Sequence, residues 1–188
     1  GARAGLLTKQ QLEEYLKKTG IRLSGALTYQ EEAVLTTQYV AAMLGLAPIC
    51  LGNPGPLRNK AAMRKIFWDN GIPQPKYINC SKGEDAIKAV KAIAVPCVIK
   101  PVELLASLGV RKIEHFNEEA ILKAFANAHN VDIHEEDLKH GFNISSEVLV
   151  EEYIPAIQEI SVEGAVYRGQ MTIIAVTKKY LGPEPEFE

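Results

Sequence analysis

The chain has 188 residues, of which 47% are hydrophobic and 23% charged, and its formal net charge is -2 at pH 7. These values are typical of a globular protein with one or two modest domains, and they exclude a strongly basic surface for nucleic acid or anionic membrane. No apolar run reaches the roughly 18 residues of a membrane span, and the N-terminus lacks a signal-peptide pattern, so we expect a cytoplasmic protein. Cys50, Cys80 and Cys97 are odd in number and far apart, which indicates reduced thiols.

The first part of the chain predicts helices that alternate with short strands. Capping-box patterns at Thr8 and Thr28 open two predicted helices, and a third helix is predicted from about 59 to 70 after a turn rich in Gly and Pro. Two apolar runs are predicted strands: 21–27 and 49–51. This alternation indicates a partial N-terminal parallel α/β layer, which we assign to residues 1–79.

Residues 80–150 predict a small α+β module. One helix is expected after a capping box at Ser81, and another after an Asn cap at Asn117. Three apolar runs are predicted strands: 96–100, 110–113 and 148–154. The fold class that we expect is therefore α/β with α+β character.

The last part of the chain predicts a β-hairpin. Apolar side chains alternate from Ile160 to Ala175 around a turn at Arg168 and Gly169. We assign residues 151–188 to the beginning of an antiparallel C-terminal sheet.

Three cations are candidates for binding an anion. Lys100 ends a buried apolar strand, where its ammonium must be desolvated unless an anion meets it. Lys60 and Arg64 lie four residues apart, so they share one face of a predicted helix. Each feature also fits a cation that simply reaches solvent. The connection 107–110 offers a hydroxyl and a flexible backbone that can face a phosphate.

Carboxylates follow the last strand of the module. Glu151 and Glu152 stand beside an apolar pair, and Glu159 comes eight residues after Glu151. Such a hinge can offer backbone groups to an adenine edge and a carboxylate to ribose hydroxyls. Taken alone, the pattern equally fits charged residues at the edge of a strand.

The histidine-rich segment 127–146 also contains several carboxylates. The spacings between His129, His134 and His140 match no common zinc pattern, and the segment lacks an apolar periodic face. We therefore expect a solvated insertion and no metal site there.

Taken in order, these motifs resemble the ATP-grasp superfamily. The pattern runs from Asn59-Lys60 through Val98-Ile99-Lys100-Pro101 to Glu151-Glu152-Tyr153-Ile154 and Glu159-x-Ser161-Val162-Glu163-Gly164. It covers roughly residues 21–188 and is most similar to the carboxylate-amine ligases that join amino acids, with the carbamoyl-phosphate synthase large chain a more distant relative.

The resemblance implies roles for individual residues, although it assigns no catalytic residue. It implies a set that holds the phosphates of ATP: Lys60, Lys100, Ser107 and Gly109, with Arg64 and Val110 as weaker members. It implies a second set that holds adenine and ribose: Glu151, Glu152, Tyr153, Ile154 and Glu159. Lys178 and Lys179 match, more weakly, a basic position near the acyl phosphate or metal.

The resemblance also implies ATP and Mg²⁺ as cofactors and small-molecule carboxylate and amine substrates, and a homodimer is compatible with it. We expect the metal-binding carboxylates downstream of Glu188, and we interpret the sequence as part of a longer protein that has little activity by itself. Two alternatives stay open. One is a nucleotide-binding domain without chemistry, in which Leu104 and Leu105 pack against a partner, and the other is bicarbonate activation of the carbamoyl-phosphate synthase type.

Overall fold

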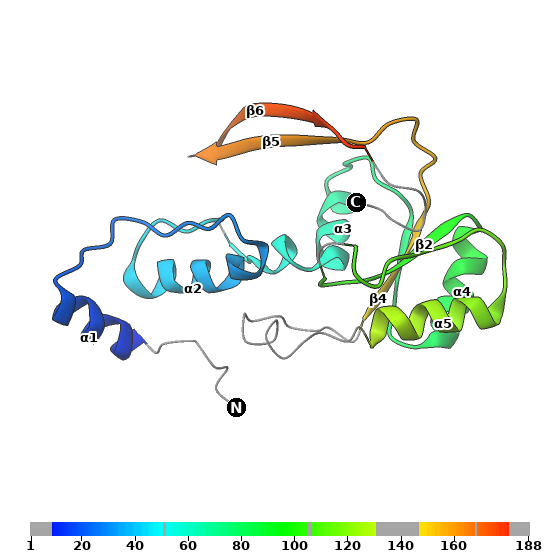
Figure 1. Cartoon of the computed structure of the whole chain (residues 1–188), viewed down its shortest axis with the longest axis horizontal. Helices are drawn as coiled ribbons and strands as arrows, with labels where there is room; N and C mark the ends of the chain where they lie inside the picture. Colours follow the sequence, from blue (N-terminus) through cyan, green and yellow to red (C-terminus); the bar gives the residue numbers. More distant parts are fainter. Residues whose placement is uncertain (1–8, 51, 105–106, 131–146, 168, 181–188) are drawn as a thin grey trace.

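The computed structural model describes residues 9–50, 52–104, 107–130, 147–167 and 169–180. Its helices are α1 (Lys9–Thr19), α2 (Val34–Leu44), α3 (Lys60–Asp69), α4 (Gly83–Ile93) and α5 (Glu118–His129), with short 3₁₀ turns η1 (Glu31–Ala33) and η2 (Gly55–Leu57). Its strands are β1 (Tyr77–Cys80), β2 (Cys97–Pro101), β3 (Arg111–Ile113), β4 (Val148–Glu152), β5 (Ile160–Tyr167) and β6 (Gln170–Lys178). In Figure 1, α1 and α2 lie at one end of the molecule and α4 and α5 at the other. None of the described helices is long and apolar enough to cross a lipid bilayer.

Four strands form one antiparallel sheet in the order β1-β4-β2-β3. Runs of β-branched and apolar residues favour β2 and β4, which the sequence predicted, and β3 also matches its predicted run. β1 was not predicted. The sheet extends from Tyr77 to Glu152, beyond both ends of the 80–150 module, and the division into modules stays a prediction.

The two faces of the sheet have different surroundings, because successive side chains of a strand point to opposite sides. One face packs against α4 and α5 and carries the buried side chains Cys97, Ile99, Val148 and Val150. The opposite face carries Val98, Lys100 and Glu151. The register pairs Val98 with Glu151 and Lys100 with Leu149, so Lys100 and Glu151 are diagonal neighbours on this face.

β5 and β6 form the predicted hairpin, paired from Ile160 with Lys178 to Tyr167 with Gln170. Gly169 in the turn has a φ of 77°, a left-handed conformation that favours glycine. A side chain at Gly164 would place its Cβ 3.1 Å from the carbonyl oxygen of Thr172, next to the irregularity in the ladder. Figure 1 shows the hairpin apart from the four-stranded sheet.

The N-terminal part forms the predicted helices, but the two strands predicted there are wrong. Among the described residues no strand includes 21–27 or 49–50, and residue 51 lies outside them. An apolar run becomes a strand only when a neighbour shares its hydrogen bonds. Residues 49 and 50 bond a side chain instead: the Ile49 amide donates to Gln38 Oε1 (2.8 Å), and Gln38 Nε2 donates to the Cys50 carbonyl (3.3 Å). The partial parallel layer is therefore not formed in this part of the structure.

Two of the predicted helix caps are also wrong. The Thr28 hydroxyl accepts a hydrogen bond from the Gln30 amide (2.9 Å), a local turn that competes with capping, and the chain enters α2 through η1 without a side-chain cap. The residue that precedes α4 is Lys82 rather than Ser81, and it makes no capping bond. Asn117 caps α5 as predicted, since its side chain accepts from the Ala120 amide (2.9 Å). Thr8 lies outside the described residues.

Candidate nucleotide site

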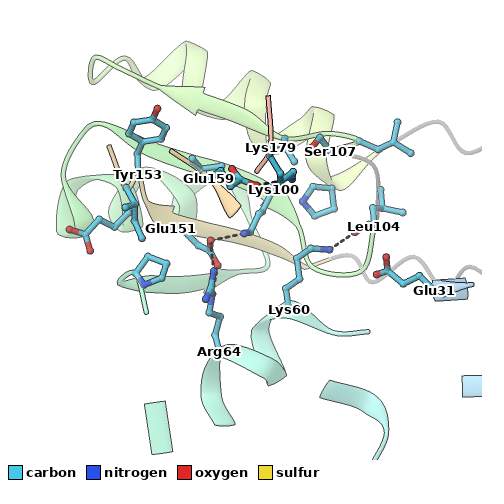
Figure 2. A pocket seen from close by; sticks show the side chains of 17 residues that line it. Glu31, Lys60, Arg64, Lys100, Leu104, Ser107, Glu151, Tyr153, Glu159 and Lys179 are labelled. Carbon is cyan, nitrogen blue, oxygen red and sulfur yellow. Dashed lines mark hydrogen bonds and ion pairs between the residues drawn. The ribbon is translucent and has the colours of Figure 1, made fainter. Parts of the chain in front are cut away.

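A cavity of about 490 Å³ lies on the face of the sheet that α4 and α5 do not cover. α3 contributes Lys60 and Arg64, β2 contributes Lys100, and β4 contributes Glu151. Figure 2 shows these three cations in the same site, with Lys100 and Arg64 directed at Glu151 and the Lys60 ammonium directed at the carbonyl of Leu104. The positive charge that the sequence predicted is thus gathered from two elements, α3 and β2, that lie apart in the chain.

Glu151 is the carboxylate to which two of these cations bind. Its Oε1 accepts from Arg64 Nε (2.7 Å), and its Oε2 accepts from Arg64 Nη2 (3.1 Å) and pairs with Lys100 Nζ (2.6 Å). Only 4% of the residue is exposed. Burial acts to raise the pKa of Glu151, but Arg64 and Lys100 outweigh burial, and the pKa lies below its usual value. Glu151 is therefore charged at neutral pH.

Lys60 and its neighbour hold the segment 102–104 against the start of α3. The Lys60 amide donates to the Val102 carbonyl (3.0 Å), and Lys60 Nζ donates to the carbonyl of Leu104. Asn59 caps α3 and also donates through Nδ2 to Glu103 Oε1 (3.0 Å). Because a carbonyl is a neutral acceptor, this hydrogen bond does not neutralise the Lys60 ammonium.

Glu31 reaches the cavity from η1 and was not predicted as a site residue. It forms an ion pair with Arg58, in which Nη1 and Oε1 are 2.5 Å apart. Burial lowers the pKa of Lys60 below its usual value, while the charge of Glu31 opposes this decrease. No sequence signal links Glu31 to this site, since its partner follows 27 residues later with no shared motif.

The turn 107–110 closes one side of the cavity. The Val110 amide donates to the Ser107 carbonyl (3.1 Å), and both Ser107 (φ 51°) and Gly109 (φ 72°) adopt left-handed conformations. Ser107 and Val110 line the cavity, whereas Gly109 shapes the turn without lining it. Leu105 lies outside the described residues, and its packing against a partner stays a prediction.

The hinge after β4 forms the other end of the cavity. The Glu152 amide donates to the Lys76 carbonyl (2.9 Å), and the Tyr153 amide donates to the Pro96 carbonyl (3.2 Å). The Lys112 ammonium lies 4.2 Å from the centre of the Tyr153 ring, a cation–π contact that orients this ring. Apolar side chains line the neighbouring walls: Pro75, Val98, Pro101, Leu104, Leu108 and Ile154.

Beyond the hinge, Glu159 forms an ion pair with Lys179, in which Oε1 and Nζ are 2.7 Å apart. Both residues line the cavity. Lys178 does not line it, and its ammonium lies 4.9 Å from the centre of the Tyr180 ring. The last residue of β6, Lys178, and the residue that follows it, Lys179, thus differ: Lys179 lines the cavity, and Lys178 contacts a tyrosine.

The cavity brings together most residues predicted for the nucleotide site: Lys60, Arg64, Lys100, Ser107, Val110, Glu151, Glu152, Tyr153, Ile154, Glu159 and Lys179. Besides Glu31, the predicted site residues did not include five apolar residues that line the cavity: Pro75, Val98, Pro101, Leu104 and Leu108. The side chains present fit a ligand with several phosphates at one end and an apolar ring at the other. Within the described ranges no three His, Cys, Asp or Glu residues are grouped to hold a metal ion. His134 and His140 lie outside those ranges.

The sequence matches the model of one protein family, and the antiparallel sheet and the cavity are consistent with that family. The model of the family described as ATP-grasp domain matches residues 93–188, which is slightly more than half of the chain. The chain therefore belongs to the ATP-grasp domain family, and the resemblance that the motifs indicated is confirmed.

Among relatives of known function, the chain is similar to ligases. It is 25% identical over 120 residues to D-alanine–D-alanine ligase of Nitrosospira multiformis, a match that covers 63% of this chain and 39% of that protein. It is 26% identical over 102 residues to the carbamoyl phosphate synthase large chain of Pyrococcus furiosus, covering 53% of this chain and 8% of that protein. The chain spans about two fifths of the length of the D-alanine–D-alanine ligases that it matches.

Solved structures support the same fold. An L-amino acid ligase from Bacillus licheniformis superimposes with a TM-score of 0.64 at 21% identity, covering 96% of this chain and 39% of that one. An ADP complex of N5-carboxyaminoimidazole ribonucleotide synthetase superimposes with a TM-score of 0.63 at 14% identity, covering 96% and 44%. At these identities the likeness establishes the ATP-grasp-like α+β fold.

Proposed function

We propose that the cavity binds ATP and that this chain is the nucleotide-binding part of an ATP-dependent carboxylate-amine ligase. The observation that carries this proposal is that Lys60, Arg64 and Lys100 line one cavity together with the hinge 152–154 and several apolar side chains. A cavity of about 490 Å³ is in the size range of small-molecule sites. The family and the ligases similar to this chain support the same function.

The geometry suggests one orientation of the nucleotide. The phosphates lie toward Lys60 and Lys100, next to the turn 107–110, because these ammonium groups can neutralise their charge. The adenine lies between apolar walls at the hinge 152–154, and its edge meets backbone groups there. Glu159 lies beyond the hinge, where its carboxylate can accept hydrogen bonds from ribose hydroxyls.

The proposed reaction has two steps. A carboxylate oxygen of the acid attacks the γ-phosphorus of ATP, the bond to ADP breaks, and an acyl phosphate forms. The amine nitrogen then attacks the acyl carbon, phosphate leaves, and the nitrogen loses a proton to give an amide. Lys60 and Lys100 stabilise the negative charge that develops on the phosphates, and the cavity limits access of water to the acyl phosphate. Mg²⁺ would supply further positive charge to the phosphates, but the described residues include no ligand set for it.

We propose amino acids as both the acid and the amine. The relatives named D-alanine–D-alanine ligase and the L-amino acid ligase support this substrate class. The carbamoyl phosphate synthase relative keeps bicarbonate as a second candidate for the activated acid. Incubation with ATP, Mg²⁺ and a panel of D- and L-amino acids or bicarbonate, followed by phosphate release and mass spectrometry of the product, separates these candidates.

Binding of nucleotide is tested by calorimetry of the full chain with ADP and ATP. Lys100→Ala removes an ammonium from the cavity, and we expect it to weaken ADP binding about tenfold or more. Lys91→Ala is the matched control, since Lys91 pairs with Glu118 on the surface away from the cavity (3.1 Å). Absence of ADP binding, or equal effects of both substitutions, would contradict the proposed site. Nucleotide binding without turnover on any substrate would instead support a binding domain without chemistry.

A further inference from the structure

Tyr153, the residue that follows β4, lines two cavities. One is the nucleotide cavity of about 490 Å³, and the other is a neighbouring cavity of about 370 Å³. In Figure 2 the Tyr153 ring lies at the edge of the site, on the side away from Leu104. Because the ring stands on a shared boundary, its orientation affects the shape of the nucleotide cavity at the hinge. The two cavities share four lining residues: Tyr153, Ile154, Glu159 and Lys179.

A lysine of the edge strand β3 contacts this ring. Lys112 Nζ lies 4.2 Å from the centre of the Tyr153 ring. In the sheet, β2 lies between β3 and β4, and Val98 on β2 is the register partner of both Lys112 and Glu151. Lys112 is therefore on the same face of the sheet as Glu151, which is the face that carries the cavity. From there its side chain crosses β2 to reach the ring.

The surroundings of Lys112 strengthen its contact with the ring. Its side chain is 15% exposed, and a cation–π contact gains strength when the cation is withdrawn from water. Glu114 Oε1 lies 3.1 Å from Lys112 Nζ, and this ion pair restricts the flexible lysine stem. Because Glu114 also balances the charge of Lys112, the lysine adds little positive potential at the proposed phosphate positions. An effect of Lys112 on a bound nucleotide must therefore pass through the Tyr153 ring.

We propose that Lys112 is a positioning residue of the nucleotide site: it holds the Tyr153 ring in place as a wall at the base end of the cavity. This inference rests on the proposed function, which directs the adenine toward the hinge 152–154, and it extends that site to a residue that does not itself line the cavity. Without the ammonium the ring can shift toward the neighbouring cavity, so that the base loses a rigid surface. Lys112 should therefore affect the affinity for the base and not the affinity for the phosphates.

Calorimetry of the full chain with ADP, adenosine and inorganic pyrophosphate tests this inference. Adenosine and pyrophosphate are measured by competition with ADP, so that weak binding remains measurable. Lys112→Met keeps an apolar stem and removes the charge, and we expect it to weaken ADP and adenosine by the same factor, about three- to tenfold. Pyrophosphate binding should change less than about twofold, since Glu114 already balances the charge of Lys112. Lys112→Arg should retain the wild-type affinities, because a guanidinium also packs on an aromatic face.

A double-mutant cycle shows whether Lys112 acts through the ring. In a Tyr153→Leu background we expect Lys112→Met to change ADP binding less than about twofold, since the ring that it holds is gone. In a Tyr153→Phe background, which keeps the ring, we expect the full effect of Lys112→Met. No loss of ADP binding on Lys112→Met, an equal loss for pyrophosphate, an equal loss with Lys112→Arg, or additive effects with Tyr153→Leu would overturn the inference. Failure of the wild type to bind ADP would instead overturn the proposed function.

A second cation–π contact provides the matched control. Lys91 Nζ lies 5.0 Å from the centre of the Phe116 ring and pairs with Glu118 on the exposed surface. Lys91→Met should leave the binding of all three ligands unchanged. Circular dichroism should confirm that each variant folds. If Lys112→Met does not fold, Lys112→Gln removes the same charge with a polar side chain, and the same pattern of losses across the three ligands is then the supporting result.

Discussion

The four-stranded sheet and the β5–β6 hairpin are both antiparallel ladders, but the described structure buries only one of them. Ile99 on β2 and Ile121 on α5 are fully buried, whereas Ile173 and Val176 on β6 are 60% and 61% exposed. Backbone hydrogen bonds are similar in both ladders, so the difference lies in the apolar area removed from water. In the described structure the hairpin is held by backbone pairing between β5 and β6. In the four-stranded sheet, α4 and α5 also cover the apolar side chains of one face.

The ion pairs at the two ends of the cavity show the same contrast. Glu151 in the sheet is 4% exposed and has two cationic partners. Glu159 precedes the hairpin, and its side chain and that of Lys179 are 47% and 33% exposed. Because water screens an exposed pair, equal contact distances do not imply equal energies.

The largest difference in the free energy of unfolding should be found between a buried and an exposed apolar side chain. We expect Ile121→Ala to lower the free energy of unfolding by about 2–5 kcal/mol, because it leaves a cavity in the core. We expect Ile173→Ala to change it by no more than about 0.5 kcal/mol, as at other exposed positions. Urea unfolding followed by circular dichroism measures both values. A comparable loss at Ile173 would show that the hairpin face is buried in the protein in solution.

Acid should weaken the sheet through Glu151. The folded pKa of Glu151 lies below the ordinary value of 4.5, so the charged form is favoured by folding. Its contribution to stability is therefore complete above pH 4.5 and is lost as the pH falls through the folded pKa. We expect wild-type stability to decrease more steeply with acid than that of Glu151→Gln. Parallel pH profiles from urea unfolding would contradict this expectation.

The two helix caps predicted at Asn117 and Ser81 should differ in their contribution to stability. Asn117→Ala removes the hydrogen bond to the Ala120 amide, and we expect a loss of about 1 kcal/mol. Ser81→Ala serves as the control, since Ser81 does not occupy the cap position of α4, and we expect a change within about 0.5 kcal/mol. Thermal unfolding of both variants decides whether the structural assignment of the caps is right.

The smallest effect should come from the exposed pair next to the hairpin. We expect Glu159→Gln to lower the free energy of unfolding by less than about 1 kcal/mol, because the Glu159–Lys179 pair is screened by water. The difference from wild type should decrease further in high salt. A larger loss that does not depend on salt would place this pair in a buried environment.

Local patterns predicted most of the helices and strands, and they failed where partners lie far away in the sequence. β2, β4 and the hairpin have apolar periodicity of their own. β1 is only four residues long, and it forms because Tyr77 pairs opposite Glu151. The run 21–27 has a similar apolar content but no strand partner among the described residues.

The sequence was enough to predict which residues belong to the candidate site, but not which contacts they make. Motif order predicted Lys60, Lys100 and Glu151 as members, because each lies at or next to the end of an element at a recognisable spacing. The pairing of Arg64 with Glu151 spans 87 residues and appears only when α3 packs on the uncovered face of the sheet. Glu31 belongs to the capping-box pattern at Thr28, which predicts the start of a helix and not a ligand site, and only the tertiary structure brings it to the cavity.

Side chains alternate between the two faces of the sheet along β4, and this limits where residues can be inserted or deleted. Val150 faces the helices and Glu151 faces the cavity, one residue apart on a strand paired on both sides. Insertion or deletion of a single residue before Glu151 would exchange the two, so that a carboxylate entered hydrocarbon and a valine met Lys100. The turn at Gly169 has no such coupling. Length variation is therefore compatible with the hairpin tip and incompatible with β4.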